Sequence, residues 1–309
     1  MILACGEALI DMLPRKSTEG EDAFAPFAGG AVFNTAVALG RLGVQTAFFS
    51  GLSSDLFGDI LRDQLSASNV DASPAHISNR PTTMAFVRLV NGQASYTFYD
   101  ENTAGRMLTE AELPEVTAQA LFFGGISLAV EPCGATYAAL QAREADKRVT
   151  MIDPNIRPSF IVDEPRFRAR ITAMMDRADI IKLSDEDLHW LYGTGDAAEL
   201  ARALLTPVGQ PGPKLVCVTE GAKGATGYYY GGAVFAAAKA VTVVDTVGAG
   251  DTFNAGILAS LHEAGALTKS GINSLTEAQI NAALMRGVQT AAITVSRAGA
   301  NPPWAHELT

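Results

Sequence analysis

The chain has 309 residues, 48% of them hydrophobic and 18% charged, with a formal net charge of −10 at pH 7 and a pI near 4.9. A chain of this length can bury a large core, and at roughly 150 residues per domain it has room for two domains. The acidic balance and the lack of a basic run argue against nucleic acid or anionic membranes as partners. An anionic substrate would need a local positive pocket.

The cysteines and the hydropathy of the chain further restrict the classes of protein to which it can belong. Cys5, Cys133 and Cys217 are widely spaced and odd in number, which is typical of buried thiols in a reducing compartment. The four histidines show no metal-ligand spacing. The first apolar run is broken by Glu7 and Asp11 and no basic region precedes it, so we expect no signal peptide. No apolar run is long enough to span a membrane, and we expect a soluble cytoplasmic protein.

The first elements predict a strand, a second extended piece and a helix. Residues 1–5 begin a buried strand that we expect to end near Asp11, at the edge of a cleft, where this acid either contacts a ligand or faces solvent. Residues 24–28 are extended, and Gly29-Gly30 opens a helix over residues 31–39. The paired glycines indicate close approach of a ligand or simply a tight turn. Asn34, in the first turns, either faces that ligand or is solvated.

The next segment predicts a small separate sheet. Residues 45–50 form a strand and 59–65 a helix. Residues 81–90 and 94–99 then alternate as strands around Asn91-Gly92, a strong two-residue hairpin signal. Because no helix separates these strands, they do not belong to a βαβ series. We expect residues 12–28 and 80–100 to form a small sheet that acts as a lid beside an active site.

From residue 110 onward strands alternate with helices. We predict strands at 120–123, 149–153, 179–183 and 214–219, and helices at 133–144, 165–175, 186–192, 197–204 and 276–296. This order predicts a three-layer, doubly wound α/β fold in one domain, 1–309, with a mostly parallel sheet and ligands at the carboxyl ends of its strands. The polar residues at those ends are Gly124-Gly125, residues 153–157, Lys182 and residues 219–224.

The most informative stretch covers residues 244–256. A β-rich segment, 240–244, leads into a glycine turn and then a helical pattern. Gly248 and Gly250 leave free N–H groups at the helix entrance, and these groups with the helix dipole suit a phosphate. A phosphate repels a carboxylate, so Asp251 either caps the helix or removes a proton from a hydroxyl that attacks phosphorus.

Two separated signatures resemble those of the ribokinase-like (PfkB) carbohydrate kinases. Residues 245–253 resemble the C-terminal signature of that family. Gly29-Gly30 with Asn34, followed by Gly51, Asp55 and Gly58, resembles its N-terminal signature. The chain has neither a Gly-x-x-x-x-Gly-Lys-[Ser/Thr] loop nor a well-placed Gly-x-Gly-x-x-Gly after the first strand, which argues against P-loop enzymes and dinucleotide dehydrogenases. Because the resemblance runs from end to end, the chain is identified as a member of this family.

The resemblance implies a role for each matching residue. Asp251 is then the catalytic base. The anion hole for the transferred phosphoryl group consists of Gly248, Ala249 and Gly250, with Arg157 stabilising the charge. The residues implied to bind the sugar are Asp11, Gly29, Gly30, Asn34, Phe98 and Arg106. Those implied to bind ATP are Asn155, Lys182, Thr219, Gly221 and Gly224, with helix 276–296 beside the adenine.

The resemblance also implies metal ions. It implies ATP with Mg²⁺, and a monovalent cation, K⁺, near Asp245 and Val247. Where the family usually has Asn-x-x-Glu, this chain has Ser184-Asp185-Glu186-Asp187. Asp187 therefore offers its carboxylate on a shorter arm, and we expect it to act on Mg²⁺ through water.

Residues 182–188 and 296–304 resemble bacterial fructokinases, which implies transfer of the γ-phosphate of ATP to the terminal hydroxyl of D-fructose. The alternative is a 2-keto-3-deoxygluconate kinase or another sugar kinase of the family. Such sugar-acid kinases carry an arginine where this chain has Asp100-Glu101, which either repel an acid or face solvent. Arg88 and Arg106 are the candidate substitutes for that arginine. A catalytically silent sugar-binding protein is the alternative from another class, and a homodimer stays open as an assembly.

Overall fold

The structure is a computed structural model that describes residues 1–90 and 93–308, with the side chains of 88–90 and 93–96 outside the description. The predicted turn at Asn91-Gly92 and the side chain of Arg88 therefore lie outside the described residues.

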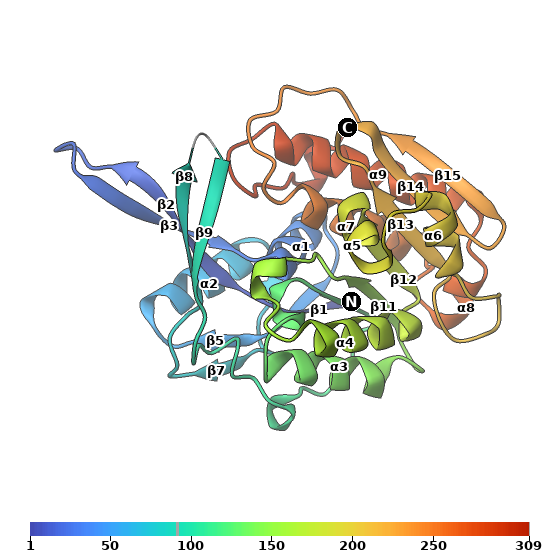
Figure 1. Cartoon of the computed structure of the whole chain (residues 1–309), viewed down its shortest axis with the longest axis horizontal. Helices are drawn as coiled ribbons and strands as arrows, with labels where there is room; N and C mark the ends of the chain where they lie inside the picture. Colours follow the sequence, from blue (N-terminus) through green and yellow to red (C-terminus); the bar gives the residue numbers. More distant parts are fainter. Residues whose placement is uncertain (91–92, 309) are drawn as a thin grey trace.

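A nine-stranded, mostly parallel sheet forms the centre of the molecule (Figure 1). Its order is β15-β14-β13-β12-β11-β10-β1-β4-β6. The parallel strands are β1 (Ile2–Cys5), β4 (Thr46–Phe49), β6 (Val70–Asp71), β10 (Ala120–Gly124), β11 (Val149–Asp153), β12 (Ile180–Ser184) and β13 (Leu215–Thr219). The hairpin β14 (Gly224–Tyr229) and β15 (Gly232–Ala237) continues one edge in antiparallel fashion.

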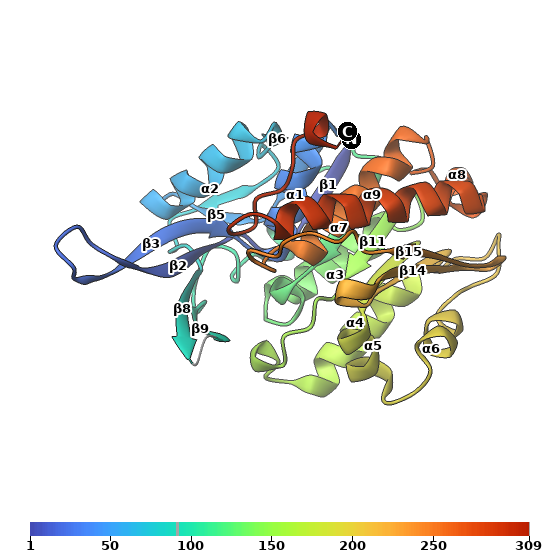
Figure 2. The same cartoon turned by 90° about the horizontal axis from the view of Figure 1, so that it is seen from above.

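Helices cover both faces of this sheet, as Figure 2 shows from above. One face carries α1 (Ala31–Arg41), α2 (Leu56–Ala67), α7 (Ala249–Glu263), α8 (Lys269–Asn273) and α9 (Glu277–Val295); the other carries α3 (Cys133–Glu144), α4 (Glu164–Arg177), α5 (Asp185–Tyr192) and α6 (Ala197–Ala203). Successive residues of β1 alternate between two hydrophobic cores: Ile2 packs into one and Leu3 into the other. A strand buried on both faces is typical of parallel sheets, and it confirms the predicted three-layer α/β fold.

A four-stranded sheet stands off the main body (Figure 1). Its order is β3-β2-β8-β9, from β2 (Leu9–Lys16), β3 (Asp22–Gly29), β8 (Met84–Val90) and β9 (Gln93–Tyr99). Phe86 makes edge-to-face contacts with Phe24 and Tyr99, so aromatic pairs help to hold the sheet together. A further short pair, β5 (Gly51–Ser53) with β7 (His76–Ser78), lies at its base.

The structure corrects the position of Asp11. The first core strand ends at Cys5, and a new strand, β2, begins at Leu9. Asp11 therefore belongs to the small sheet, where its backbone lies opposite Phe27 and Ala85. The predicted core strand ending near Asp11 is wrong because residues 6–8 leave the sheet and redirect the chain.

The predicted strand at 240–244 is also wrong. This segment is irregular, and the backbone N–H groups of Val244 and Asp245 both donate to the carbonyl of Val295 at the end of α9. Val241, Val243 and Val244 are exposed. The alternating valines favour a strand, but β-propensity requires a neighbouring strand and a face to bury, and here the chain offers neither.

The catalytic helix of the predicted site packs very closely on its neighbour. A Cβ added to Gly256 of α7 would lie 2.7 Å from the Cα of Gly287 in α9, so the two backbones touch at this point. The helix begins after Gly248, which has the left-handed φ of 79° and lies against Ala300. The last helix and the C-terminal segment thus fix the start of α7 at the carboxyl ends of the strands.

Short 3₁₀ turns complete the fold: η1 (Glu110–Glu112), η2 (Ile126–Leu128), η3 (Pro158–Phe160), η4 (Gly221–Lys223) and η5 (Ala305–Glu307). In the part of the chain that the structure describes, no helix is both long and apolar enough to cross a lipid bilayer.

Candidate active site

Asp251 lies in the first turn of α7, and its side chain is buried. Its Oδ2 accepts a hydrogen bond of 2.9 Å from Nδ2 of Asn34 in α1. The next residue of α1, Thr35, places its hydroxyl 3.0 Å from the backbone oxygen of Asp251. A second helix, α1, therefore holds the carboxylate by a hydrogen bond. A residue that only capped α7 would not need this contact.

Burial raises the pKa of Asp251 to about 7. The hydrogen bond from Asn34 and the charge of Lys182 oppose this rise, while the carboxylates of Asp153 and Glu7 add to it. A carboxylate with a pKa near neutral pH is well suited to accept a proton and to release it again. The electrostatics support the interpretation of Asp251 as a general base.

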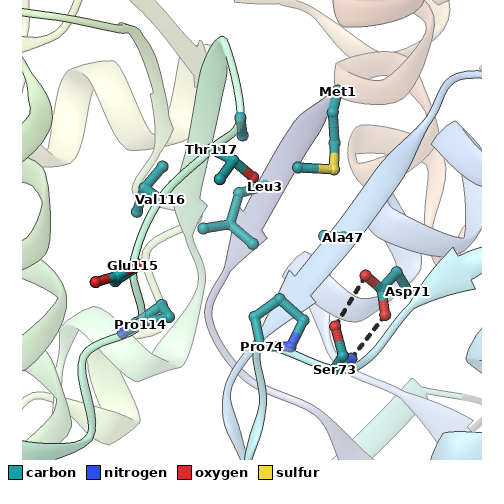
Figure 3. A pocket seen from close by; sticks show the side chains of 11 residues that line it. Met1, Leu3, Ala47, Asp71, Ser73, Pro74, Pro114, Glu115, Val116 and Thr117 are labelled. Atoms are coloured by element: carbon teal, nitrogen blue, oxygen red, sulfur yellow. Dashed lines mark hydrogen bonds between the residues drawn. The ribbon is translucent and has the colours of Figure 1, made fainter.

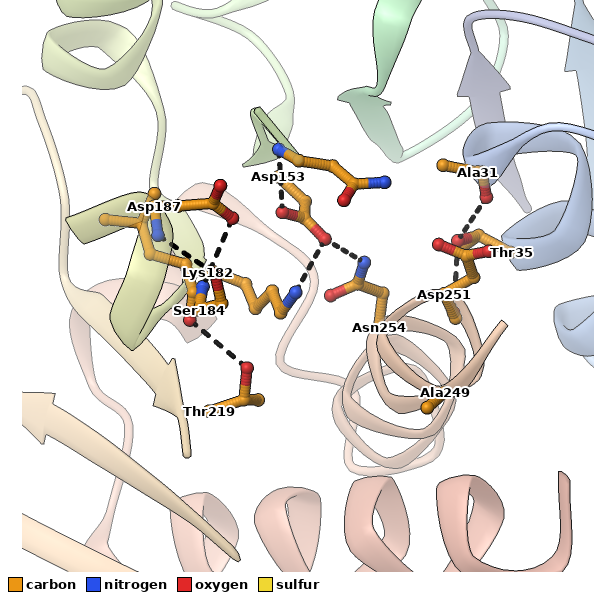
Figure 4. A network of polar contacts seen from close by, with 12 residues as sticks. Ala31, Thr35, Asp153, Lys182, Ser184, Asp187, Thr219, Ala249, Asp251 and Asn254 are labelled. Carbon is orange, nitrogen blue, oxygen red and sulfur yellow. Dashed lines mark hydrogen bonds and ion pairs between the residues drawn. The ribbon is translucent and has the colours of Figure 1, made fainter. Parts of the chain in front are cut away.

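A buried polar network lies beside the base. Nζ of Lys182 is 3.0 Å from Oδ2 of Asp153, the last residue of β11, and Nδ2 of Asn254 donates to the same oxygen at 2.7 Å (Figure 4). Burial opposes the charge on Lys182, but Asp153 and Asp187 outweigh it and raise the pKa of the ammonium group. Lys182 is therefore a buried permanent cation.

This cation lies directly against the glycine turn. A Cβ added to Gly250 would be 3.2 Å from Nζ of Lys182. The free N–H groups at the start of α7 and the positive end of its dipole therefore meet an ammonium group at one point. A phosphate at this position would find the local positive pocket that an acidic protein needs for an anionic substrate.

The paired glycines before α1 each lie against an acidic residue. A Cβ on Gly29 would lie 2.3 Å from Oδ2 of Asp11, and one on Gly30, whose φ is 108°, would lie 2.9 Å from the carbonyl oxygen of Glu7. Both glycines therefore make room for an acidic residue. Burial raises the pKa of Asp11 to about 6.

Asp100 is not solvated. Its side chain is 11% exposed, and it accepts a hydrogen bond from Thr83 and pairs with Arg106, whose Nη1 lies 3.4 Å away. Nε of Arg106 donates to the carbonyl of Glu131, which fixes the guanidinium group. Burial raises the pKa of Asp100, against the effect of Thr83 and Arg106. Glu101, in contrast, is exposed.

Comparisons with known proteins identify the family of the chain. The model of the pfkB family of carbohydrate kinases matches residues 1–307. The chain belongs to the pfkB family of carbohydrate kinases.

It is 58% identical over 279 residues to a fructokinase from Rhizobium leguminosarum bv. trifolii, covering 90% of this chain and 84% of that protein. A fructokinase from Xylella fastidiosa with bound ATP superimposes with a TM-score of 0.88 at 28% identity, over 99% of this chain and 96% of that one. A fructokinase from Vibrio cholerae O395, bound to fructose, ADP and calcium, gives a TM-score of 0.82 at 27% identity, over 97% and 94% of the two chains.

In this pfkB kinase the unusual Ser184-x-x-Asp187 motif is a helix cap. Ser184 Oγ accepts from the N–H of Asp187, and the Asp187 carboxylate accepts from the N–H groups of Ser184 and Ile156. Burial, together with Asp153, raises the pKa of Asp187. The reciprocal bonds form a capping box, which the shorter aspartate completes.

These contacts decide how a metal ion would fit. Both Asp187 oxygens already accept a backbone hydrogen bond, and among the described residues no group of three or more His, Cys, Asp or Glu side chains could hold a metal ion. Mg²⁺ fits such a site, since it keeps several waters and is usually held through substrate phosphates and one or two carboxylates. Asp187 would then act through bound water.

Other predicted residues lie apart from the network around Asp251. Arg157 is exposed, and its Nη1 donates to the carbonyl of Ile156. Asp245 accepts hydrogen bonds from the N–H groups of Val247 and Gly299, which ties the loop before α7 to the C-terminal segment. The ring of Phe98 packs edge-to-face on that of Phe160, at 4.3 Å between centroids.

The residues predicted for ATP lie where β12, β13 and β14 meet. Thr219 ends β13, and its hydroxyl lies 3.4 Å from the carbonyl of Leu183 in β12. Gly221 begins η4 and Gly224 follows it, both with positive φ. Asn155 follows β11 with a φ of 44°, and its N–H donates to Asp153. A Cβ at Gly224 would meet the carbonyl of Ala236, so this glycine also serves the fold.

Sequence reasoning missed several residues of the site. Glu7, Ser127, Thr35 and Asn254 are all buried and hydrogen-bonded near the base. Asn254 was detectable in principle, because it lies one turn after Asp251 on the same helix and must share its face. Glu7 and Ser127 had no such signal, since their partners are far away in sequence.

One cavity of the molecule lies away from this site. A cavity of about 240 Å³ opens at the amino ends of β1 and β4, lined by residues that include Met1, Leu3, Ala47, Asp71 and Pro114 (Figure 3). This is the edge of the sheet opposite to Asp251, so the cavity is separate from the candidate active site.

Replacing Asp251 by Asn should nearly abolish phosphoryl transfer. Loss of a general base typically lowers kcat by about 10²–10⁴-fold. ATP should bind as tightly or slightly more tightly, because a repulsive charge is removed, and the melting temperature should not fall. ADP release and calorimetric ATP titration measure the two effects, and a variant that keeps most of its turnover would disprove the role of Asp251.

Replacing Asn34 by Ala should move the pH profile upward. The hydrogen bond from Asn34 favours the ionised form of Asp251, so its loss raises the pKa of the base further above its ordinary value. Since only the ionised base accepts a proton, the acid limb of kcat/KM, which reports the free enzyme, should shift to higher pH. An unchanged limb, or one shifted to lower pH, would contradict this assignment.

Proposed function

We propose that this chain transfers the γ-phosphate of ATP to the terminal hydroxyl of D-fructose and so forms fructose 6-phosphate. The observation that carries the proposal is the buried carboxylate of Asp251, held by Asn34 at 2.9 Å beside a glycine turn that faces the ammonium group of Lys182. Base, anion site and cation together are the parts that phosphoryl transfer requires. The similarity to fructokinases supports the choice of sugar.

Each part has a defined task. Asp251 accepts the proton of the sugar hydroxyl as its oxygen attacks the γ-phosphorus, a new O–P bond forms, and the bond to the β-phosphate oxygen breaks to release ADP. The N–H groups at Gly248 to Gly250 and the Lys182 ammonium group stabilise the charge of the transferred group. Arg157, exposed at the end of its loop, would reach the donor phosphates from the solvent side.

Mg²⁺, when bound with ATP, would neutralise part of the phosphate charge, and Asp187 would hold it through water. Thr219, Gly221, Gly224 and Asn155 would line the nucleotide site, with α9 beside the adenine. A monovalent cation near Asp245 and Val247 would add a fixed charge to the loop that leads into α7.

A neutral sugar fits the region of Arg106 better than a sugar acid does. Two unit charges about 4 Å apart interact by ~4 kcal/mol at the intermediate dielectric of a protein surface. An unpaired Arg106 would therefore attract a substrate carboxylate strongly. Here Asp100 already pairs with it, and a carboxylate placed nearby would meet a neutral pair. This disfavours the alternative of a 2-keto-3-deoxygluconate kinase.

A catalytically silent sugar-binding protein is the alternative from another class. In such a protein a buried carboxylate next to an anion site would only weaken the binding of a phosphate. It would not increase the rate of any reaction. The grip of Asn34 and Thr35 on Asp251 favours an enzyme.

The small sheet of β2, β3, β8 and β9 would act as the lid of this site. It stands off the main body, and it carries Asp11 and Phe98, both assigned to the sugar. Closure of such an element excludes water from the transferred phosphoryl group. The sheet would therefore determine when the site becomes competent for transfer.

A coupled ADP-release assay over a panel of sugars tests the substrate. Fructose should give a higher kcat/KM than 2-keto-3-deoxygluconate. Replacing Asp100 by Asn should shift this ratio toward the acid, because the nearly isosteric change removes a charge and leaves Arg106 unpaired. The exposed pair Glu164–Arg168 on α4 supplies a control, Glu164→Gln, that changes net charge equally.

A wild-type kcat/KM for the sugar acid equal to or above that for fructose would overturn the substrate assignment. A ratio that Glu164→Gln shifts as much as Asp100→Asn does would contradict the local role of Asp100.

Hydrogen exchange tests the lid. Amides of β2 and β3 should exchange more slowly when saturating fructose is added, since Asp11 would then hold the strand against the sugar. The hairpin β14–β15, at the far edge of the main sheet, provides an internal control that should not change. Equal exchange of β2 and β3 with and without sugar would indicate a fixed wall or a subunit interface.

A further inference from the structure

Glu7 is a buried carboxylate that no step of the transfer uses. It follows β1, and its side chain is 8% exposed. Oε1 accepts from the N–H of Ala31 at 2.9 Å, and Oε2 lies 2.9 Å from the hydroxyl of Ser127. Its backbone carbonyl accepts from the N–H of Phe33 at 3.2 Å. One residue thus binds two N–H groups at the start of α1.

These bonds replace a cap that α1 lacks. The helix begins after Gly30, which has no side chain to accept from the first free N–H groups. A carboxylate supplied from another segment satisfies such a group and also interacts favourably with the positive end of the helix dipole. Glu7 therefore acts as an external N-terminal cap that fixes the first turn of α1.

The surrounding backbone is shaped around this carboxylate. A Cβ on Gly125, whose φ is 71°, would lie 2.0 Å from Oε1 of Glu7, and one on Gly30 would lie 2.9 Å from its carbonyl oxygen. Only glycine fits at either position, because of both the close approach and the positive φ. Three segments distant in sequence thus converge on one side chain.

The turn that Glu7 fixes is the turn that holds the base. Asn34 and Thr35 follow Ala31 within about one turn of α1, and they contact the carboxylate and the backbone oxygen of Asp251. A rotation or fraying of this turn would displace both contacts together. The path from Glu7 to Asp251 passes through α1, in which Ala31 and Asn34 lie one helical turn apart.

We infer that Glu7 is a positioning residue for the phosphoryl transfer: through the N-terminus of α1 it holds Asn34 and Thr35 where they orient Asp251 toward the sugar hydroxyl. The inference rests on the proposed function, and it adds a role for the segment after β1. The proposed function assigns Glu7 no contact with either substrate.

The geometry also identifies a conservative variant. The Ser127 hydroxyl lies 2.9 Å from Oε2 of Glu7 and 3.0 Å from the carbonyl of Gly124, and it has only one hydrogen. In Glu7→Gln, the amide oxygen can still accept from Ala31, while the amide nitrogen donates to the Ser127 hydroxyl, which in turn donates to Gly124. Only the longer bond, 3.4 Å, that Oε2 accepts from the N–H of Ser127 is lost. This variant keeps the cap, whereas Glu7→Ala removes it.

A double-mutant cycle with Asn34 tests the inference. Glu7→Ala should lower kcat by roughly 10- to 100-fold, the cost of a misplaced catalytic group, with little change in KM for ATP. Glu7→Gln should recover most of that loss. Because Glu7 acts through the turn that carries Asn34, the loss in the Glu7→Ala/Asn34→Ala double variant should be well below the product of the two single losses.

The control is Asp179→Asn. Asp179 is also a buried carboxylate that accepts a backbone N–H, from Thr150, but it lies at the amino end of β12 and pairs with Lys269. The Asp179→Asn variant should have a lower melting temperature and an unchanged kcat. If Glu7→Ala does not fold, Ser127→Ala, which releases only Oε2, should give a smaller loss with the same non-additivity toward Asn34→Ala.

An unchanged kcat in Glu7→Ala, or losses that add fully to those of Asn34→Ala, would overturn the inference. Both results can be obtained only with an active wild-type enzyme. If the proposed function were wrong, the wild-type chain itself would phosphorylate no sugar of the panel, so the two failures can be told apart.

Discussion

The burial of the Asp251 carboxylate is the constraint on which the rest of the site depends. A carboxylate removed from water resists ionisation, and here the pKa rises to about 7. The side chains around it adjust that value in both directions: Asn34 and Lys182 favour the ionised form, and Asp153 and Glu7 oppose it. Four elements meet at this point, and each contributes one residue: α1 carries Asn34, α7 carries Asp251, β11 carries Asp153 and β12 carries Lys182.

Lys182 resolves the conflict between an acidic protein and an anionic substrate. A buried ammonium group needs a countercharge and hydrogen-bond acceptors, and Asp153 supplies the countercharge and accepts one of the three N–H donors at 3.0 Å. Asp153 in turn accepts from Asn254 and from the N–H of Asn155. Since Asn254 belongs to α7, the hydrogen bonds that stabilise the ion pair also tie the catalytic helix to the sheet, and they fix the cation against Gly250.

Features that depend on residues close together in sequence could be predicted from the sequence. The alternation of strands and helices indicated the parallel sheet, and the glycine turn before Asp251 indicated an anion site. The valines at 240–244 misled because strand propensity does not reveal whether a partner strand exists. The role of Glu7 could not be predicted, because its partners Ala31 and Ser127 are 24 and 120 residues away in sequence. Only the folded chain brings them together. The Ser184-x-x-Asp187 cap has a local signature, but the prediction for Asp187 was a contact to Mg²⁺ through water.

The glycines at 29 and 30 connect the small sheet to the base. Strand β3 ends at Gly29 and α1 begins at Ala31, so one short hinge separates a strand of the lid from the helix that grips Asp251. If the lid closes as proposed, its motion pulls on the first turn of α1. Glu7 binds that turn to the core side of the hinge through Ala31, and Asp11 lies on the lid side, against Gly29. A cap anchored in the core would therefore let the proposed lid move while Asp251 keeps its orientation.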